Sequence, residues 1–136
     1  MKLMTKELEA HFKKIGSQEA VDDPTVLVKF FDPSGSATWY VTELFYVIKR
    51  KDEDGETETL EVAASKIDQF KDYEVVDMVF FGYASIFGDH NDEWGYFSLS
   101  EFHSVKGPFG LGIERDLYFE PQPISKACPK ALGRIK

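Results

Sequence analysis

The sequence has 136 residues, one cysteine (Cys128) and a formal net charge of -8. A chain of this length buries enough apolar surface to fold as one domain without a disulfide or a structural metal. One cysteine excludes an intramolecular disulfide, and no apolar run approaches the ~20 residues of a membrane-spanning helix, so we expect a cytoplasmic protein.

The charge is unevenly distributed along the chain. Residues 1–16 carry four lysines and two glutamates, and residues 122–136 carry four basic residues and no acid, so the body between them carries -14. A field of this sign repels nucleic-acid phosphates and attracts basic partners. The plainer alternative is that the charge keeps a small protein soluble.

A helix and two strands are expected first. Thr5 is a suitable N-cap for a helix over residues 6–14, in which apolar side chains recur at helical spacing before Gly16. β-Branched and aromatic residues then predict strands over residues 25–31 and 37–48. The second of these is long enough to bend or to contain a bulge.

A hairpin and a short helix are expected next. Asp54 and Gly55 are a turn signal that precedes a strand over residues 57–63. Ser65, with an acid three residues later, resembles a helix start, and the helix would extend to about Lys71.

Residues 79–101 predict two aromatic strands joined by a polar loop. Gly82 in the first strand either admits a bulge or lets a neighbouring ring approach closely. In the second strand, Ser98 and Glu101 have the spacing of a capping box, which predicts a helix that begins at Leu99.

The chain ends with a last predicted strand over residues 113–120 and a basic tail, residues 122–136, which we expect to be flexible. These elements predict a single α+β domain over residues 1–121. Its sheet would be antiparallel, open or barrel-like, with about five to six strands, an N-terminal helix and short additional helices.

Seven segments resemble a known family in their order and spacing. They are residues 1–8, 28–31, 38–43, 80–83, 93–101, 104–108 and 113–119. The family they resemble is a small bacterial one described as domain of unknown function 2958. The resemblance implies a protein of plasmids, phages or integrative elements, sometimes encoded near genes that counter host defence, and it implies no catalytic residue. Residues 48–77 depart from the compact family pattern, so a function carried there would be particular to this protein.

Charged and aromatic side chains are the candidates for contact with a partner. They are Asp89, Asp92, Glu93, Trp94 and Tyr96 around the polar loop, Asp52, Glu53 and Asp54 at the hairpin, and Lys106 and Arg115 after the short helix. In an alternating strand the acidic neighbours of Arg115 point to the opposite face, so we expect its guanidinium to pair with Glu43 or Glu101.

These features favour a non-enzymatic interaction protein of a mobile genetic element, with no cofactor. It would bind a protein that has a basic surface and inhibit a bacterial defence nuclease complex, in an anti-CRISPR or anti-restriction role. One alternative is a module that stacks single-stranded nucleic acid on exposed aromatic rings, although the acidic body lacks a basic groove. A second is a hydrolase or metal-binding enzyme built on His11, His90 and His103, whose spacing matches no ligand motif.

Overall fold

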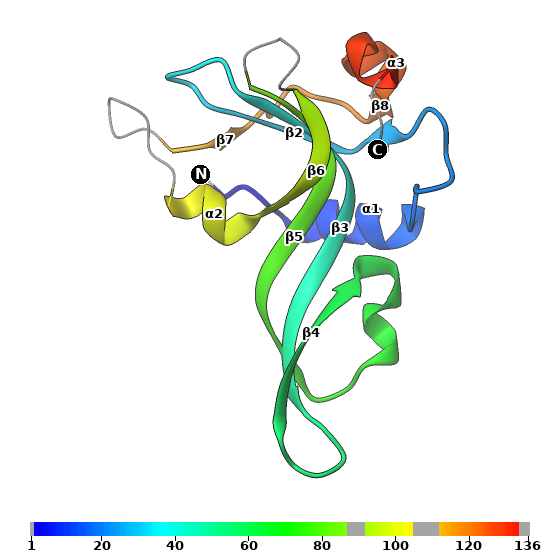
Figure 1. Ribbon diagram of the computed structural model, residues 1–136, viewed down its shortest axis with the longest axis vertical. Helices are drawn as coiled ribbons and strands as arrows, with labels where there is room; N and C mark the ends of the chain where they lie inside the picture. Colours follow the sequence, from blue (N-terminus) through cyan, green and yellow to red (C-terminus); the bar gives the residue numbers. More distant parts are fainter. Residues whose placement is uncertain (1, 87–91, 105–111, 134–136) are drawn as a thin grey trace.

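The computed structural model describes residues 2–86, 92–104 and 112–133, which form an α+β fold (Figure 1). Its elements in chain order are α1 (Lys6–Ile15), β1 (Thr25–Val26), β2 (Val28–Phe31), β3 (Thr38–Lys51), β4 (Thr57–Ala63), the 3-10 helix η1 (Ala64–Gln69), β5 (Tyr73–Ser85), β6 (Glu93–Ser98), α2 (Leu99–Ser104), β7 (Glu114–Arg115), β8 (Gln122–Pro123), α3 (Ile124–Ala127) and the 3-10 helix η2 (Pro129–Gly133).

Strand β3 is the centre of the larger, six-stranded sheet. It pairs along most of its length with β5 on one side, and on the other side with β2 near its start and β4 near its end. Strand β6 extends the sheet beyond β5, and β7 extends it beyond β2, with every pairing antiparallel. The predicted α+β class with an antiparallel sheet is confirmed, and the described strands form an open sheet. The turn of the β3–β4 hairpin projects away from the rest of the fold (Figure 1).

An extra residue in β3 changes which side chains face the main core. The register moves from Val41 opposite Gly82 to Glu43 opposite Phe81, which leaves Thr42 as a β-bulge. The core-facing residues are Trp39 and Val41 before the bulge, and Leu44, Tyr46 and Ile48 after it. Glu43 therefore lies on the opposite side of the sheet, which we call the second face.

The polar groups of the bulge have partners. The Thr42 hydroxyl donates to the carbonyl oxygen of Phe81 at 3.3 Å, and the Thr42 carbonyl oxygen accepts from Nε2 of Gln18 at 2.8 Å. The Gln18 side chain, 5% exposed, also donates to the Thr25 carbonyl and accepts from the Thr25 amide, at 2.8 and 2.7 Å. A buried amide with these three bonds ties the loop after α1 to both β1 and β3.

Helix α1 is the predicted first helix, and its N-cap is confirmed by a hydrogen bond from the Leu8 amide to Oγ1 of Thr5 at 3.2 Å. Phe12 inserts from α1 into the main core. The Tyr46 hydroxyl of β3 donates to the Glu9 carboxylate at 2.7 Å, so a hydrogen bond joins the helix and the sheet in addition to apolar packing.

Other local predictions hold in most places. The hairpin turn and β4 are confirmed, and the predicted short helix is η1. The Glu101 amide donates to Oγ of Ser98 at 3.1 Å, and helix α2 begins at Leu99 as predicted. The predicted strand over residues 25–31 is split, because the Leu27 amide donates to the carbonyl of Val41 while β1 leaves to pair with β8.

The predicted last strand over residues 113–120 is wrong beyond Arg115. The Asp116 carboxylate accepts from the Tyr118 amide at 2.9 Å, and the Asp116 carbonyl accepts from the Phe119 amide at 3.3 Å. These local bonds close a turn directly after β7.

The prediction of a flexible tail does not hold for residues 122–133. This segment forms β8, α3 and η2 and packs on the second face through Ile124, Cys128 and Ala131, each at most 6% exposed. These side chains recur at a helical spacing of four and three residues, which accounts for one buried stripe. The folded domain therefore extends to residue 133.

Gly82 is required by the close approach of β3 at the bulge. A Cβ at this position would overlap the carbonyl oxygen of Tyr40 and lie 2.9 Å from Cα of Val41. We expect Gly82→Ala to lower the free energy of unfolding by about 3 kcal/mol or more, because backbone atoms cannot move aside without disturbing the pairing of β3 with β5. Urea denaturation measures this loss. The matched control is Gly95→Ala on β6, where a Cβ would have no atom within 4 Å, and equal losses in the two variants would contradict the prediction.

The link between Tyr46 and Glu9 predicts a dependence of stability on alkaline pH. Burial and the hydrogen bond to Glu9 raise the pKa of the Tyr46 hydroxyl, so the folded chain holds this proton more tightly than the unfolded chain. The resulting stability is present below about pH 10 and is lost as the pH rises further. We expect Tyr46→Phe to lose about 1 kcal/mol at neutral pH and to show a shallower alkaline decline. Denaturant titrations across this pH range test it, with Tyr118→Phe, at a residue 95% exposed, as the variant that should keep the wild-type slope.

Candidate functional site

Two rows of side chains cross the second face from β3 through β5 to β6. The strand register aligns Tyr40, Tyr83 and Trp94 in the first row, and Glu43, Phe81 and Tyr96 in the second. The C-terminal segment covers the first row, whereas the second row opens into a groove. The site is therefore the part of the second face that lies next to the row covered by the C-terminal segment.

Two residues that the sequence suggested for partner binding, Trp94 and Asp92, instead contact the C-terminal segment. Trp94 is 8% exposed, and its Nε1 donates to the carbonyl of Ala131 at 3.1 Å. Asp92 is 1% exposed and accepts from Nζ of Lys130 at 2.7 Å and from Oγ of Ser85 at 3.1 Å. The hydrogen bond to Asp92 raises the pKa of the Lys130 ammonium. Both predicted residues thus hold the C-terminal segment in place and present little surface to a partner.

Cys128 and Tyr40 belong to the same covered region. Burial raises the pKa of the Cys128 thiol and, together with the neighbouring thiol, raises the pKa of the Tyr40 hydroxyl to about 12. Both groups therefore favour their neutral forms near neutral pH, which suits packing better than nucleophilic attack.

The groove beside the second row has a volume of 760 Å³. Strands β3, β5 and β6 supply its floor, while the loop after α1 and residues 63–66 supply its rims. Tyr96 is 65% exposed, and its ring centroid lies 4.9 Å from that of Phe81 and 5.9 Å from that of Phe45. The groove therefore offers a cluster of aromatic rings of which one is largely open to solvent.

Glu43 is the acidic group on this floor. The Glu43 residue as a whole is 9% exposed. Within the described part of the chain, its carboxylate forms neither a hydrogen bond nor an ion pair. The expected pairing with Arg115 is not formed, and Nη1 of Arg115 donates to the carbonyl of Leu3 at 3.5 Å. A carboxylate that lines an open groove without a charged partner is suited to bind a cation that arrives from outside.

The acids of the hairpin lie far from the groove. Asp52, Glu53 and Asp54 are at the turn between β3 and β4, seven or more residues beyond Phe45, or about 20 Å along the strand. The Asp52 carboxylate accepts from the amide of Asp54 at 2.9 Å and so shapes the turn, while Glu53 and Asp54 are exposed.

The remaining candidates are scattered. Glu93 is exposed at the start of β6, and Arg115 is half-buried on β7. Asp89 and Lys106 lie outside the described residues. The fold thus brings Tyr96 to the groove but does not assemble the eight described candidates into one site, and the role of all ten in partner binding stays a prediction.

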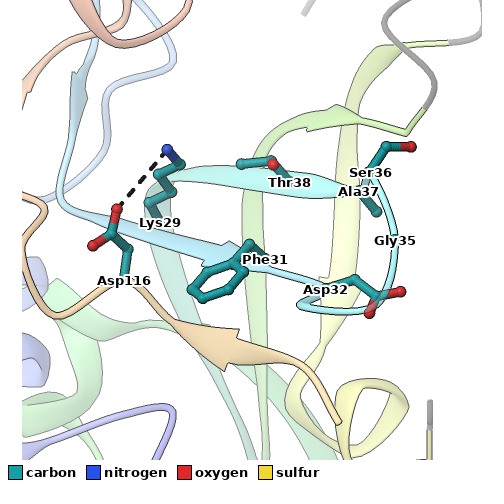
Figure 2. Close-up of a pocket in the computed structure, with 8 residues that line it drawn as sticks. All are labelled: Lys29, Phe31, Asp32, Gly35, Ser36, Ala37, Thr38 and Asp116. Carbon is teal, nitrogen blue, oxygen red and sulfur yellow. Dashed lines mark ion pairs between the residues drawn. The ribbon is translucent and has the colours of Figure 1, made fainter. Parts of the chain in front are cut away.

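A second hollow of 360 Å³ lies beside the β2–β3 turn (Figure 2). Nζ of Lys29 is 3.9 Å from the Asp116 carboxylate at one end, and the Asp32 loop forms the other end. The Asp32 carboxylate accepts from the amide and hydroxyl of Ser34 at 3.0 and 2.9 Å. Because its charged groups already have partners, this hollow is a weaker candidate than the groove.

The described residues contain neither a cluster of metal-binding side chains nor a membrane-spanning helix. In residues 2–86, 92–104 and 112–133, no three side chains of the types that bind metals come together, and this part includes His11 and His103. No helix in these ranges is long and apolar enough to span a bilayer.

Sequence reasoning considered Glu43 as an ion-pair partner of Arg115 and did not place it in a site. The available signal was an acid between Thr42 and Leu44, inside a strand that is otherwise apolar and aromatic. Acids are rarely buried without a partner, so such a residue in a central strand indicates a special role.

The fold is thus a small α+β domain with an open antiparallel sheet and a groove on one face. A family model described as "Protein of unknown function (DUF2958)" matches residues 3–55 and 70–132, and the chain belongs to this family. Comparison with curated proteins and with solved structures gives no match. The unmatched residues 56–69 contain β4 and η1, and thereby one rim of the groove.

Because the Glu43 carboxylate has no partner among the described residues, we expect that removing its charge stabilises the protein. Glu43→Gln removes a charge that has no partner among the described residues and keeps the shape of the side chain, so we expect the free energy of unfolding to rise by about 1 kcal/mol and the Tm by about 3 °C. The matched acid-to-amide control is Asp92→Asn, which weakens a buried ion pair and should lower the free energy of unfolding by about 2 kcal/mol. Thermal and urea denaturation measure both. A loss of stability in Glu43→Gln comparable to that in Asp92→Asn would show that Glu43 has a structural partner.

Proposed function

We propose that this protein is a non-enzymatic interaction module that binds the basic surface of a protein partner through the groove on its second face. The observation that carries the proposal is Glu43 on the floor of an open aromatic groove. The residue is 9% exposed, and its carboxylate has no ion pair among the described residues.

The chemistry of the groove suits protein recognition. Interfaces derive most of their affinity from a few aromatic and charged side chains in places that exclude water. Tyr96 offers an exposed aromatic surface, and Glu43 offers a charge that a cationic residue would complement. The formal net charge of -8 would in addition speed the approach of a basic partner, mainly at low salt.

The partner that fits this chemistry is a nucleic-acid-binding protein. An acidic domain bound to its basic surface would compete with DNA or RNA for the same place. In the setting that the family resemblance implies, a mobile genetic element, this activity would inhibit a bacterial defence nuclease complex, as an anti-CRISPR or anti-restriction protein does.

The surroundings of Tyr96 disfavour direct stacking of single-stranded nucleic acid. A base stacked on this ring would bring its phosphates towards the Glu43 carboxylate, since Glu43, Phe81 and Tyr96 lie in one cross-strand row. Direct nucleic-acid binding would need a positively charged groove at the same place.

The test compares the groove with an exposed aromatic residue elsewhere. Proteins captured from a lysate of the bacterium that carries the gene are identified with wild-type, Tyr96→Ala and Tyr118→Ala baits, and the stoichiometric partner is purified. We expect Tyr96→Ala to weaken binding about tenfold or more, as removal of a central aromatic contact does. Tyr118, 95% exposed and outside the groove, should change the affinity less than about twofold. Biolayer interferometry gives these affinities.

Competition completes this experiment. A nucleic-acid ligand of the partner should displace the wild-type protein, and higher salt should slow association. Equal binding by the Tyr96→Ala and wild-type proteins would contradict the proposed groove. Tight binding of single-stranded oligonucleotides to the isolated protein at low salt would favour the nucleic-acid alternative instead.

A further inference from the structure

The row of Glu43, Phe81 and Tyr96 gives the groove a defined chemical geometry. These residues are directly opposite one another on β3, β5 and β6. Neighbouring strands are about 4.8 Å apart, so the backbones of Glu43 and Tyr96 are about 10 Å apart, and Phe81 lies between them. A flat group laid over this row would meet a carboxylate at one end and an aromatic ring at the other.

The charge of that group follows from the residues of the floor. The Glu43 residue is 9% exposed and lines the groove, and its carboxylate has no ion pair in the described part of the chain. The faces of Phe81 and Tyr96 carry the negative side of the aromatic quadrupole, which attracts cations. Carboxylate and rings therefore favour the same kind of ligand, a cation.

We infer that the groove is a binding site for an arginine side chain of a protein partner, with Glu43 as its anionic ligand and Tyr96 as its stacking surface. A guanidinium is planar, donates two parallel hydrogen bonds to one carboxylate and stacks on aromatic rings. A lysine ammonium is more strongly hydrated and cannot stack, so it fits a half-buried aromatic row less well.

The size of the groove indicates that the arginine belongs to a polypeptide. The volume of 760 Å³ exceeds the volume of one side chain, and the residues that line it come from β3, β5, β6, the loop after α1 and residues 63–66. The neighbouring residues of an extended basic segment would occupy the remainder. This inference rests on the proposed function and names the residue type that the partner would contribute.

Lys66 provides a test of whether the ligand is cationic or anionic. It is exposed on η1, at the rim formed by the segment outside the family match, and it lines the same groove. An arginine in the groove would be repelled by Lys66, whereas an anionic ligand would be attracted by it. Neutralising this lysine must therefore change the affinity in opposite directions for the two ligand classes.

The experiment uses the full chain and three peptides. An acetylated and amidated seven-residue peptide of glycine and serine with one central arginine is compared with versions that carry lysine or citrulline, the neutral isostere of arginine. NMR titration gives the affinities. We expect the arginine peptide to shift the amide signals of residues 43, 81 and 96 and to bind at least tenfold more tightly than the citrulline peptide. The lysine peptide should bind more weakly than the arginine peptide.

Three variants test whether the arginine peptide binds in the groove. We expect Glu43→Gln to weaken the binding of the arginine peptide about tenfold, which corresponds to the loss of one charged hydrogen-bonded contact. The matched control is Glu120→Gln, an exposed acid outside the groove, which should change the affinity less than about twofold because exposed charges interact weakly. Lys66→Gln should strengthen the binding. Amide spectra of each variant confirm that it is folded.

The outcomes that overturn the inference differ from those that overturn the proposed function. Equal affinity for the arginine and citrulline peptides, or weaker binding of the arginine peptide after Lys66→Gln, would exclude an arginine site. If a captured partner depends on Tyr96 but the arginine peptide does not bind, this inference alone fails. If the peptide binds as described but no protein partner is captured, the proposed function fails, and what remains of the inference is the affinity of the groove for a guanidinium.

Discussion

The extra residue at Thr42 is the constraint on which the arrangement of this fold depends. In an uninterrupted strand the side chains of Val41 and Glu43 would point to the same side. The bulge instead places Leu44 in the main core and Glu43 on the second face. Its consequences extend to neighbouring elements, because Gly82 has no room for a side chain and Gln18 must supply an amide to the Thr42 carbonyl. Packing on one face and the composition of the groove on the other thus follow from one residue.

Two buried acids on the second-face side of the sheet are treated differently. Asp92 has an ammonium at 2.7 Å and a backbone amide, from Ile86, at 2.8 Å. Glu43 is 9% exposed and lines the groove, and no described residue gives its carboxylate either kind of partner. The partners of Asp92 stabilise the fold, whereas the unpaired charge of Glu43 lowers the stability of the fold. This contrast indicates a structural role for Asp92 and supports the proposed binding role of Glu43.

The sequence predicts the elements whose determinants are local. Thr5, the turn before β4 and Ser98 each act through hydrogen bonds or backbone preferences within a few residues, and each is found in the structure. Predictions that depend on distant contacts fare worse. The burial of Trp94 requires the C-terminal segment to fold over it, and the end of the strand at Arg115 is set by a turn that competes with pairing. The position of Glu43 could not be predicted, because one inserted residue reverses the orientation of every side chain that follows it.

The groove combines two parts of the chain that differ in their relation to the family. Its floor, with Glu43, Phe81 and Tyr96, lies within the matched residues, whereas the rim at residues 63–66 lies in the unmatched segment 56–69. A rigid sheet is suited to hold a charge and aromatic rings at fixed spacing, and a rim beside it is suited to discriminate among ligands that share that chemistry. An unfavourable charge such as Lys66 can contribute to such discrimination, because specificity depends on what is repelled as well as on what is bound. The floor would then determine that a cation binds, and the rim would determine which basic segment can present it.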